Sequence, residues 1–391
     1  MTDTLSTPAT PATPATPATQ ATPATPGTPA TSDADVRPVT RQAAEQTPTA
    51  LWNDSADPRE LATAIHEYGA VGATCNPVIA YTCIQQDAEH WVPRIREIAA
   101  EHPTAGESWI GWKAVEELSI AAAAQLLPAF EASGGRNGRL SMQTDPRFHR
   151  DQEALVEQAV RFSQLAPNII VKIPATKVGI AAIEEAAYRG VSINATVSFT
   201  VPQVVAVGEA IERALDRRAA DGLPQQEFGH VVTLMAGRFD DWLKTVVARE
   251  HVMVDPGILE WAGVAAVKHA YRVFQERGFR SRVLVAAFRN PLQWSEFQGG
   301  DLVVSPPFQW SKDINDNAFP WRPDAIHDEV PAAVIAALRA ATPEFARGYD
   351  VDGMTIDEFD RFGATATTLR QFLDADAKLD ALVRDIIVPA A

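Results

Sequence analysis

The chain has 391 residues, and its 34 Lys+Arg against 50 Asp+Glu give a net charge of −16 with His neutral. This length allows two domains or one large α/β barrel. Because 46% of the residues are hydrophobic and 21% are charged, a fibrous or wholly disordered chain is excluded. The negative balance makes nucleic acid and anionic membranes poor partners, although a local basic pocket for a small phosphate is still allowed.

Cysteine content and the opening residues indicate the compartment. Cys75 and Cys83 are too few for a disulfide framework and, with no clustered histidines, too few for a zinc site. The start, MTDTLSTPAT, lacks the basic and apolar regions of an export signal, and no stretch approaches the ~18 apolar residues of a membrane span. We therefore expect a cytoplasmic protein with no metal and no membrane partner.

Residues 1–40 are predicted to form a disordered arm. From Thr7 to Thr31 the chain is almost entirely Thr, Pro and Ala in a three-residue rhythm. Repeated proline removes backbone donors and favours extended polyproline II conformations. The arm is either a tether or interaction segment or a solubilising extension, and we expect the folded domain over residues 41–391.

From about residue 50 onward, short β-branched runs alternate with longer amphipathic stretches, the pattern of a βα repeat. Several of the runs are continuously apolar in the middle, as expected of parallel strands covered on both faces. Eight candidate strands follow one another, near Trp52, Ala73, Met142, Val171, Asn194, Val232, Leu284 and Val303.

Between these runs lie stretches with apolar residues at helical spacing. They cover residues 58–69, 152–166, 179–190, 201–222 and 258–278. Eight strands each followed by a helix predict a (β/α)8 TIM barrel, with a doubly wound open sheet as the second interpretation. We expect extra helices in residues 78–138 and, after Pro307, C-terminal helices that cap the barrel mouth.

The predicted strands end in an unusually polar set of residues. In a barrel of this kind the chemistry gathers at the C-terminal ends of the strands. The residues found there are Asp54, Thr74, Asn76, Gln143, Lys172, Asn194, Thr196, Thr233, Arg238, Arg289 and Asn290.

Lys172 is the sharpest candidate because it sits inside the apolar run NIIVKIPAT. If its side chain points into the barrel, desolvation and the nearby Arg238 and Arg289 lower its pKa. A neutral amine is then available as a nucleophile toward a carbonyl. The ordinary alternative is a lysine that reaches the surface or pairs with a carboxylate.

Asp54 and Asn76 each have a catalytic and a structural interpretation. Asp54 is a general base or the cap of the helix that follows it, and Asp57 is the better-placed cap residue. Asn76 precedes a proline, so its amide either orients a substrate hydroxyl or closes a turn.

At this spacing the motifs resemble a known family. GATCNPVIA, NIIVKIPATKVGIAAI, GVSINATVSFTVPQ, MAGRFDDW and VLVAAFRN, in this order, are similar to transaldolases over about residues 50–310. The resemblance implies a class I enzyme without metal or organic cofactor that acts in the pentose phosphate pathway. Such an enzyme moves a dihydroxyacetone unit from a ketose phosphate to an aldose phosphate through a lysine Schiff base.

The resemblance also implies roles for individual residues. Lys172 matches the Schiff-base lysine, Asp54 the acid/base that deprotonates the leaving alcohol, and Thr196 a hydroxyl that holds a catalytic water. The matching substrate-binding residues are Asn76, Asn194, Arg238 and Arg289, to which we add Thr74 and Thr233 at the strand ends. Arginine suits phosphate because the guanidinium presents several fixed donors.

Three positions depart from the family pattern. Gln143 stands where most members carry a glutamate that works with the catalytic water; a Gln resembles the fructose 6-phosphate aldolases. Those enzymes pair the Gln with a tyrosine, but Met235 occupies that position here. Ala287 replaces a small hydroxyl residue, which removes a phosphate contact, and Thr233 replaces a serine but keeps the hydroxyl.

These departures keep two alternatives open. The first is a related aldolase that releases free dihydroxyacetone, or a transaldolase variant that acts on an unusual sugar. The second is a non-catalytic sugar-phosphate binding protein. Monomer and homodimer are both compatible with the sequence.

Overall fold

The computed structural model describes residues 37–225 and 229–389, and within them eight parallel strands form one sheet. Each strand lies where the sequence predicts one. The strands are β1 (Ala50–Leu51), β2 (Gly72–Thr74), β3 (Arg139–Gln143), β4 (Ile169–Pro174), β5 (Ile193–Thr196), β6 (Val231–Met235), β7 (Arg282–Ala286) and β8 (Val303–Ser305).

The sheet closes on itself as a barrel. Its strand order runs β1-β8-β7-β6-β5-β4-β3-β2, and a parallel bridge between Asn53 and Ala73 joins the two ends. The Asn53 amide donates to the Gly72 carbonyl, and the Thr74 amide donates to the Asn53 carbonyl, both at 2.9 Å. The predicted (β/α)8 barrel is confirmed, and the open-sheet interpretation is wrong.

Helices surround the barrel. The first half of the described chain contains α1 (Val39–Gln46), α2 (Pro58–Thr63), the π-helix η1 (Ala64–Tyr68), α3 (Pro77–Gln86), α4 (Ala88–Glu101), α5 (Glu107–Ala132), the 3-10 helix η2 (Pro146–Phe148), α6 (Gln152–Ser163), α7 (Lys177–Tyr188) and α8 (Val201–Ala220). The second half contains α9 (Ala236–Arg249), α10 (Pro256–Leu259), α11 (Ala262–Arg277), α12 (Leu292–Ser295), α13 (Phe308–Asp316), the 3-10 helices η3 (Ala325–His327) and η4 (Ile356–Arg361), α14 (Ala332–Ala341), α15 (Pro343–Tyr349) and α16 (Gly363–Ile387).

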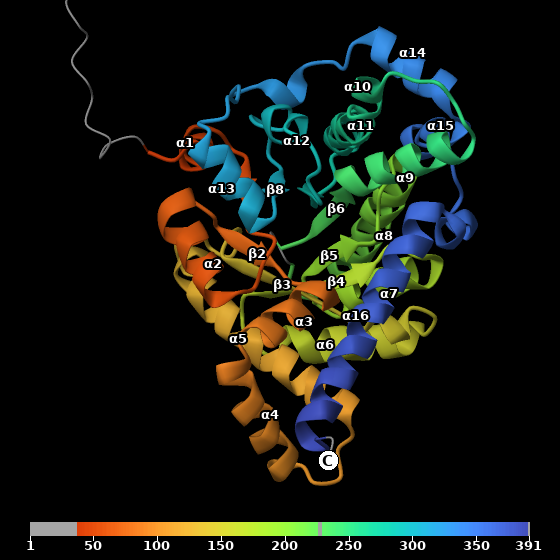
Figure 1. Cartoon of the computed structure of the whole chain (residues 1–391). Helices are drawn as coiled ribbons and strands as arrows, with labels where there is room; N and C mark the ends of the chain where they lie inside the picture. Colours follow the sequence, from red (N-terminus) through yellow and green to blue (C-terminus); the bar gives the residue numbers. More distant parts are fainter. Residues whose placement is uncertain (1–36, 226–228, 390–391) are drawn as a thin grey trace, which may run out of the picture. The chain divides into compact units, whose positions relative to one another are not determined.

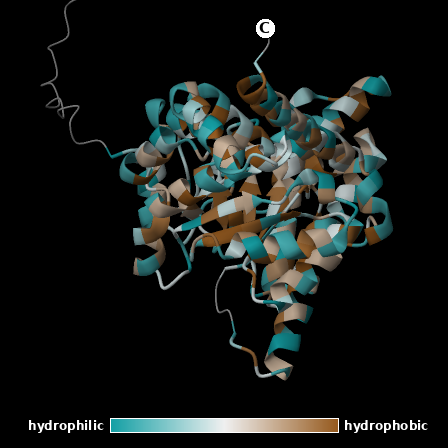
Figure 2. Cartoon of the chain, turned by 90° about the horizontal axis from the view of Figure 1, so that it is seen from below, coloured by the Kyte–Doolittle hydropathy of each residue, from teal (hydrophilic) through white to brown (hydrophobic). Residues whose placement is uncertain are grey.

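Two apolar cores hold the barrel together. A small core inside it contains Trp52, Ile170, Val231, Leu284 and Val303, all at most 2% exposed. A larger one lies between the strands and the surrounding helices, so the strands are apolar on both faces as the continuous runs predict. Figure 2 shows the hydrophobic strands at the centre, ringed by helices with hydrophilic residues.

The extra helices gather beside one part of the barrel. Helices α3, α4 and α5 fill the predicted excursion, and α16 packs against all three and against α9 (Figure 1). Arg238, which follows β6, donates to Gln371 on α16, so the C-terminal helix reaches the mouth as predicted.

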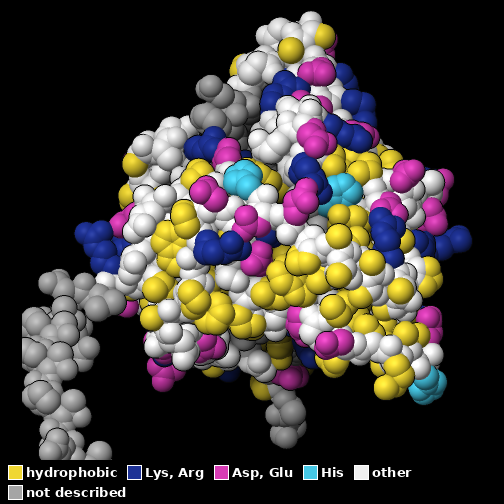
Figure 3. Space-filling view, turned by 90° about the horizontal axis from the view of Figure 1, so that it is seen from above, with side chains coloured by type: hydrophobic (Ala, Val, Ile, Leu, Met, Phe, Trp, Pro, Cys, Tyr) yellow, Lys and Arg dark blue, Asp and Glu magenta, His cyan; other side chains and the backbone are white. Residues whose placement is uncertain are grey.

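The predicted arm lies outside the described residues except at its end, where α1 begins at Val39. Among the helices of the described segments, none is long and apolar enough to cross a membrane. On the face shown in Figure 3, acidic and basic side chains are interspersed with hydrophobic ones.

Candidate active site

Lys172 lies inside the barrel on β4. Its Cα pairs in register with Gln143 on β3 and Asn194 on β5, and the residue is 4% exposed. Its Nζ forms no hydrogen bond or ion pair with a described residue. Burial lowers the pKa of Lys172; Asp54 and Cys75 oppose this shift, and Arg238 adds to it. The environment therefore favours a neutral amine, which is the nucleophilic form.

Asp54 follows β1 and contacts Thr74 at the end of β2. The Thr74 hydroxyl donates a hydrogen bond to Asp54 Oδ1. The helix cap belongs to Asp57, whose Oδ1 accepts from the amides of Arg59 at 2.9 Å and Glu60 at 3.1 Å. Asp54 is thus not needed to cap α2 and stands near Lys172, which leaves its carboxylate available for chemistry.

Asn76 caps α3. Its Oδ1 accepts from the amides of Val78 at 2.9 Å and Ile79 at 3.1 Å, so the turn-closing interpretation is confirmed. The side-chain nitrogen makes no hydrogen bond with the described residues and remains available as a donor. Its contact with substrate stays a prediction.

Asn194 is held from both sides inside the barrel. Its amide nitrogen donates to Ser141 Oγ at 2.8 Å, and Thr233 Oγ1 donates to Asn194 Oδ1 at 2.7 Å. These bonds fix the amide orientation beside Lys172. Ser141 was missed at the sequence level, although it lies two residues before Gln143 and therefore on the same face of β3.

Two buried polar atoms near Lys172 have no partner among the described residues. They are Thr196 Oγ1 and Gln143 Oε1, on residues that are 0% and 5% exposed. A buried polar atom of this kind is usually satisfied by water or a ligand. Both are therefore placed to hold a water molecule or a substrate hydroxyl.

Arg238 and Arg289 lie near each other at the mouth. Burial, and then the charge of Arg289, lowers the pKa of Arg238. Arg238 Nη1 donates to Gln371 at 2.5 Å, and Arg289 Nε donates to Asp241 at 2.9 Å. Arg238 Nε is buried without a partner, so this pair retains a donor for a phosphate group.

A buried amide and carboxylate support the Arg289 loop. The Arg289 amide donates to Gln293 Oε1 at 2.5 Å, and Gln293 Nε2 donates to Asp240 at 2.7 Å. Asn290 also donates to Asp240, at 3.3 Å, so its role is structural. Gly237 allows this packing, because a Cβ there would lie 2.0 Å from the Ala287 carbonyl oxygen.

The remaining departures also lie at the strand ends. Met235 ends β6 and is 6% exposed. Ala287 follows β7 with a φ of 62°, a left-handed conformation that is uncommon for alanine. Within residues 37–225 and 229–389, no group of His, Cys, Asp and Glu side chains could hold a metal ion.

The fold and these residues define a (β/α)8-barrel protein with a buried amine at the C-terminal mouth of the barrel. Residues 51–357 match the family described as Transaldolase/Fructose-6-phosphate aldolase. The chain belongs to this family.

Curated relatives include several transaldolases. The transaldolase of Thiobacillus denitrificans is 28% identical over 321 residues, 78% of this chain and 84% of the relative. That of Parafrankia sp. is 28% identical over 318 residues, 78% and 81% of the two chains. Transaldolase 1 of Streptomyces avermitilis is 30% identical over 219 residues, 55% of this chain, and the match spans only 57% of that relative.

Proposed function

We propose that this protein transfers a dihydroxyacetone unit between sugar phosphates through a Schiff base on Lys172. The donors are fructose 6-phosphate or sedoheptulose 7-phosphate, and the acceptor is an aldose phosphate such as erythrose 4-phosphate. The main support for this proposal is the buried, unpaired Lys172 amine near Asp54 in a chain of this family. The proposal places the protein in the cytoplasmic pentose phosphate pathway.

Lys172 and Asp54 act on different bonds of the substrate in this mechanism. The neutral Lys172 amine attacks the ketone carbon, and loss of water gives a protonated imine that draws electrons from the adjacent carbon–carbon bond. Asp54, oriented by Thr74, takes the proton of the hydroxyl on the leaving carbon. The bond breaks to release an aldehyde and leaves a three-carbon enamine, which then attacks the acceptor aldehyde.

The polar residues around Lys172 and Asp54 bind the sugar phosphate. The fixed amide of Asn194 and the free amide nitrogen of Asn76 orient hydroxyl groups, and Arg238 and Arg289 take the phosphate. Thr196 holds the water. Ala287 has no hydroxyl, so the phosphate site has one contact fewer than in most family members. This favours substrates that make additional contacts with the protein outside the phosphate site.

A second candidate is a class I aldolase that releases free dihydroxyacetone or acts on an unusual sugar. Gln143, Met235 and Ala287 favour it, since they replace the proton-transfer and phosphate groups of most family members. A purely binding protein is disfavoured, because a binding site has no need of a buried amine whose pKa is lowered by burial.

Activity with and without acceptor separates these candidates. Fructose 6-phosphate with erythrose 4-phosphate should give sedoheptulose 7-phosphate, whereas release of dihydroxyacetone without acceptor indicates the aldolase. Lys172→Met should abolish turnover. Lys177→Met is the matched control, because that lysine is 62% exposed and pairs with Asp357. Normal turnover by the Lys172 variant would contradict the proposal.

A further inference from the structure

Formation and hydrolysis of the imine on Lys172 need an acid nearby, but the residue beside Lys172 on β3 is the amide Gln143. Imine formation requires a proton for the hydroxyl that leaves as water, and hydrolysis requires the reverse transfer. Gln143 is registered with Lys172, but an amide side chain neither supplies nor takes up a proton at neutral pH. In the proposed function Asp54, which accepts from Thr74, serves the carbon–carbon bond. A second acid near Gln143 would supply the proton of the imine steps.

A small cavity lies between Gln143 and the C-terminal helix. Its lining includes Asn76, Trp112, Gln143, Asp376 and Leu379. Its volume is about 10 Å³, which is room for about one water molecule. Gln143 Oε1 has no hydrogen-bond partner among the described residues, and Gln143 and Asp376 both line this cavity, so a water molecule there would lie between them. Asp376 is the one carboxylic acid among the described residues of the lining.

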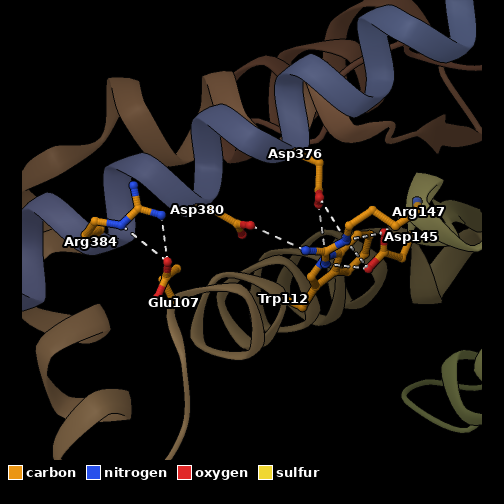
Figure 4. Close-up of polar contacts among 7 residues, drawn as sticks. All are labelled: Glu107, Trp112, Asp145, Arg147, Asp376, Asp380 and Arg384. Atoms are coloured by element: carbon orange, nitrogen blue, oxygen red, sulfur yellow. Dashed lines mark hydrogen bonds and ion pairs between the residues drawn. The ribbon is translucent and has the colours of Figure 1, made fainter.

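Asp376 lies on α16 and is 4% exposed (Figure 4). Its Oδ1 accepts from Trp112 Nε1 at 3.1 Å, and its Oδ2 lies 3.0 Å from Arg147 Nε. Burial, and then the charge of Asp145, raises the pKa of Asp376 to about 7; Arg147 opposes this shift and Asp380 adds to it.

The other elements around the cavity add no opposing charge. The Cys75 thiol lines it, and burial raises the pKa of that thiol, so it stays neutral. Helix α3 carries no charged residue along residues 77–86. The charged groups that most affect the pKa of Asp376 are therefore Asp145, Arg147 and Asp380, and the hydrogen bond from Trp112 on α5 favours the carboxylate form.

We propose that Asp376 supplies and recovers the proton of the imine steps through a water molecule bound to Gln143. The protonated carboxyl gives its proton through this water to the carbinolamine hydroxyl. The carbon–oxygen bond breaks, water leaves, and the nitrogen lone pair forms the protonated imine, with Asp376 left as a carboxylate. During hydrolysis the carboxylate takes a proton back from the attacking water. This inference rests on the proposed function.

The test compares two carboxylates on one helix. Asp376→Asn should slow imine formation about 10²-fold, the usual effect of losing an acid/base group, and should remove a pH dependence of that step near the Asp376 pKa of about 7. The readout is a single-turnover time course with fructose 6-phosphate, quenched with borohydride across pH. Asp380→Asn is the matched control, because Asp380 pairs with Arg147 but does not line the cavity.

A second substitution separates proton transfer from a structural role. Gln143→Glu places a carboxyl beside Lys172 and should restore most of the rate lost by Asp376→Asn. If Asp376 only contacts Trp112 and Arg147, Gln143→Glu should change the rate of the parent protein and of the Asp376 variant by the same factor, whereas a proton-transfer role predicts a larger gain in the variant. The inference is overturned if Asp376→Asn retains the rate of Asp380→Asn, or if the folded double variant shows no recovery.

Two further results keep the test decisive. If Asp376→Asn does not fold, Asp380→Asn decides alone: removing this neighbouring charge lowers the pKa of Asp376, so the pH dependence should move to lower pH at an unchanged plateau. An unmoved profile overturns the inference. If the unmodified protein forms no adduct with any sugar phosphate, the proposed function itself fails, and this outcome is distinct from a slow Asp376 variant.

Discussion

The strand ends of the barrel and the C-terminal helix α16 both contribute residues to the candidate site, but different interactions hold those residues in place. Lys172 and Asn194 lie side by side on neighbouring strands. Their side chains face the barrel interior because side chains alternate between the two faces of a strand, and the small core inside the barrel is apolar. Gln371, which contacts Arg238, and Asp376, which lines the cavity beside Gln143, are placed by the packing of α16 against α3, α5 and α9. In the proposed mechanism the strand residues carry the carbon–carbon chemistry, and α16, remote in sequence, is assigned the proton supply and a contact to the phosphate-binding arginine.

Asp54→Asn tests the strand-end side and has the largest expected effect of the variants below. Turnover should fall about 10²–10⁴-fold, because an amide cannot accept the alcohol proton. Lys172 should still form an imine, so borohydride should trap the intact sugar in place of a three-carbon fragment. Asp57→Asn is the control, since asparagine also caps a helix. Unchanged turnover in the Asp54 variant would show that cleavage uses another base.

Gly237→Ala tests how the strand ends hold the phosphate arginines. Its Cβ would lie 2.0 Å from the Ala287 carbonyl oxygen and 2.4 Å from Arg289 Cγ, so the Arg289 loop must move. We expect KM for fructose 6-phosphate to rise on the order of 10- to 10²-fold, as for misplaced binding groups elsewhere.

Two comparisons make the Gly237 effect specific. Reaction with unphosphorylated fructose should change much less. Gly106→Ala is the control, because a Cβ there meets nothing within 4 Å. An equal loss with both sugars would assign Gly237 to general packing.

The smallest expected effect concerns the stability of the α16 side. Because the pKa of Asp376 is raised to about 7 from its usual 3.8, the folded chain binds more protons than the unfolded chain between these values. The stabilisation is complete below the unfolded value and is lost as pH rises toward about 7. Asp376→Asn lacks this pH dependence, so the Tm of the unmodified protein should fall relative to that of the variant from about pH 4 to about pH 7. Parallel Tm curves would show that Asp376 does not titrate there.

The fold could be read from the sequence because each strand is a local apolar run bounded by polar residues. Lys172 stood out for the same reason, as a charge within such a run. Asn76 could not be resolved, because a helix cap and a substrate ligand use the same residue at the same place.

Contacts between segments that are distant in the chain could not be predicted from the sequence. The bond from Trp112 to Asp376 joins residues 264 positions apart, and no local pattern distinguishes Asp376 from the other acidic residues of its helix. Ser141 lies between these cases, because its position on the Gln143 face was readable but its bond to Asn194 was not.

The most direct test of the central claim is borohydride trapping with fructose 6-phosphate, followed by mass spectrometry of the peptide that contains Lys172. The account predicts a reduced three-carbon adduct on Lys172, which requires both imine formation and carbon–carbon cleavage. An adduct on a different lysine, or none with any ketose phosphate, would contradict it.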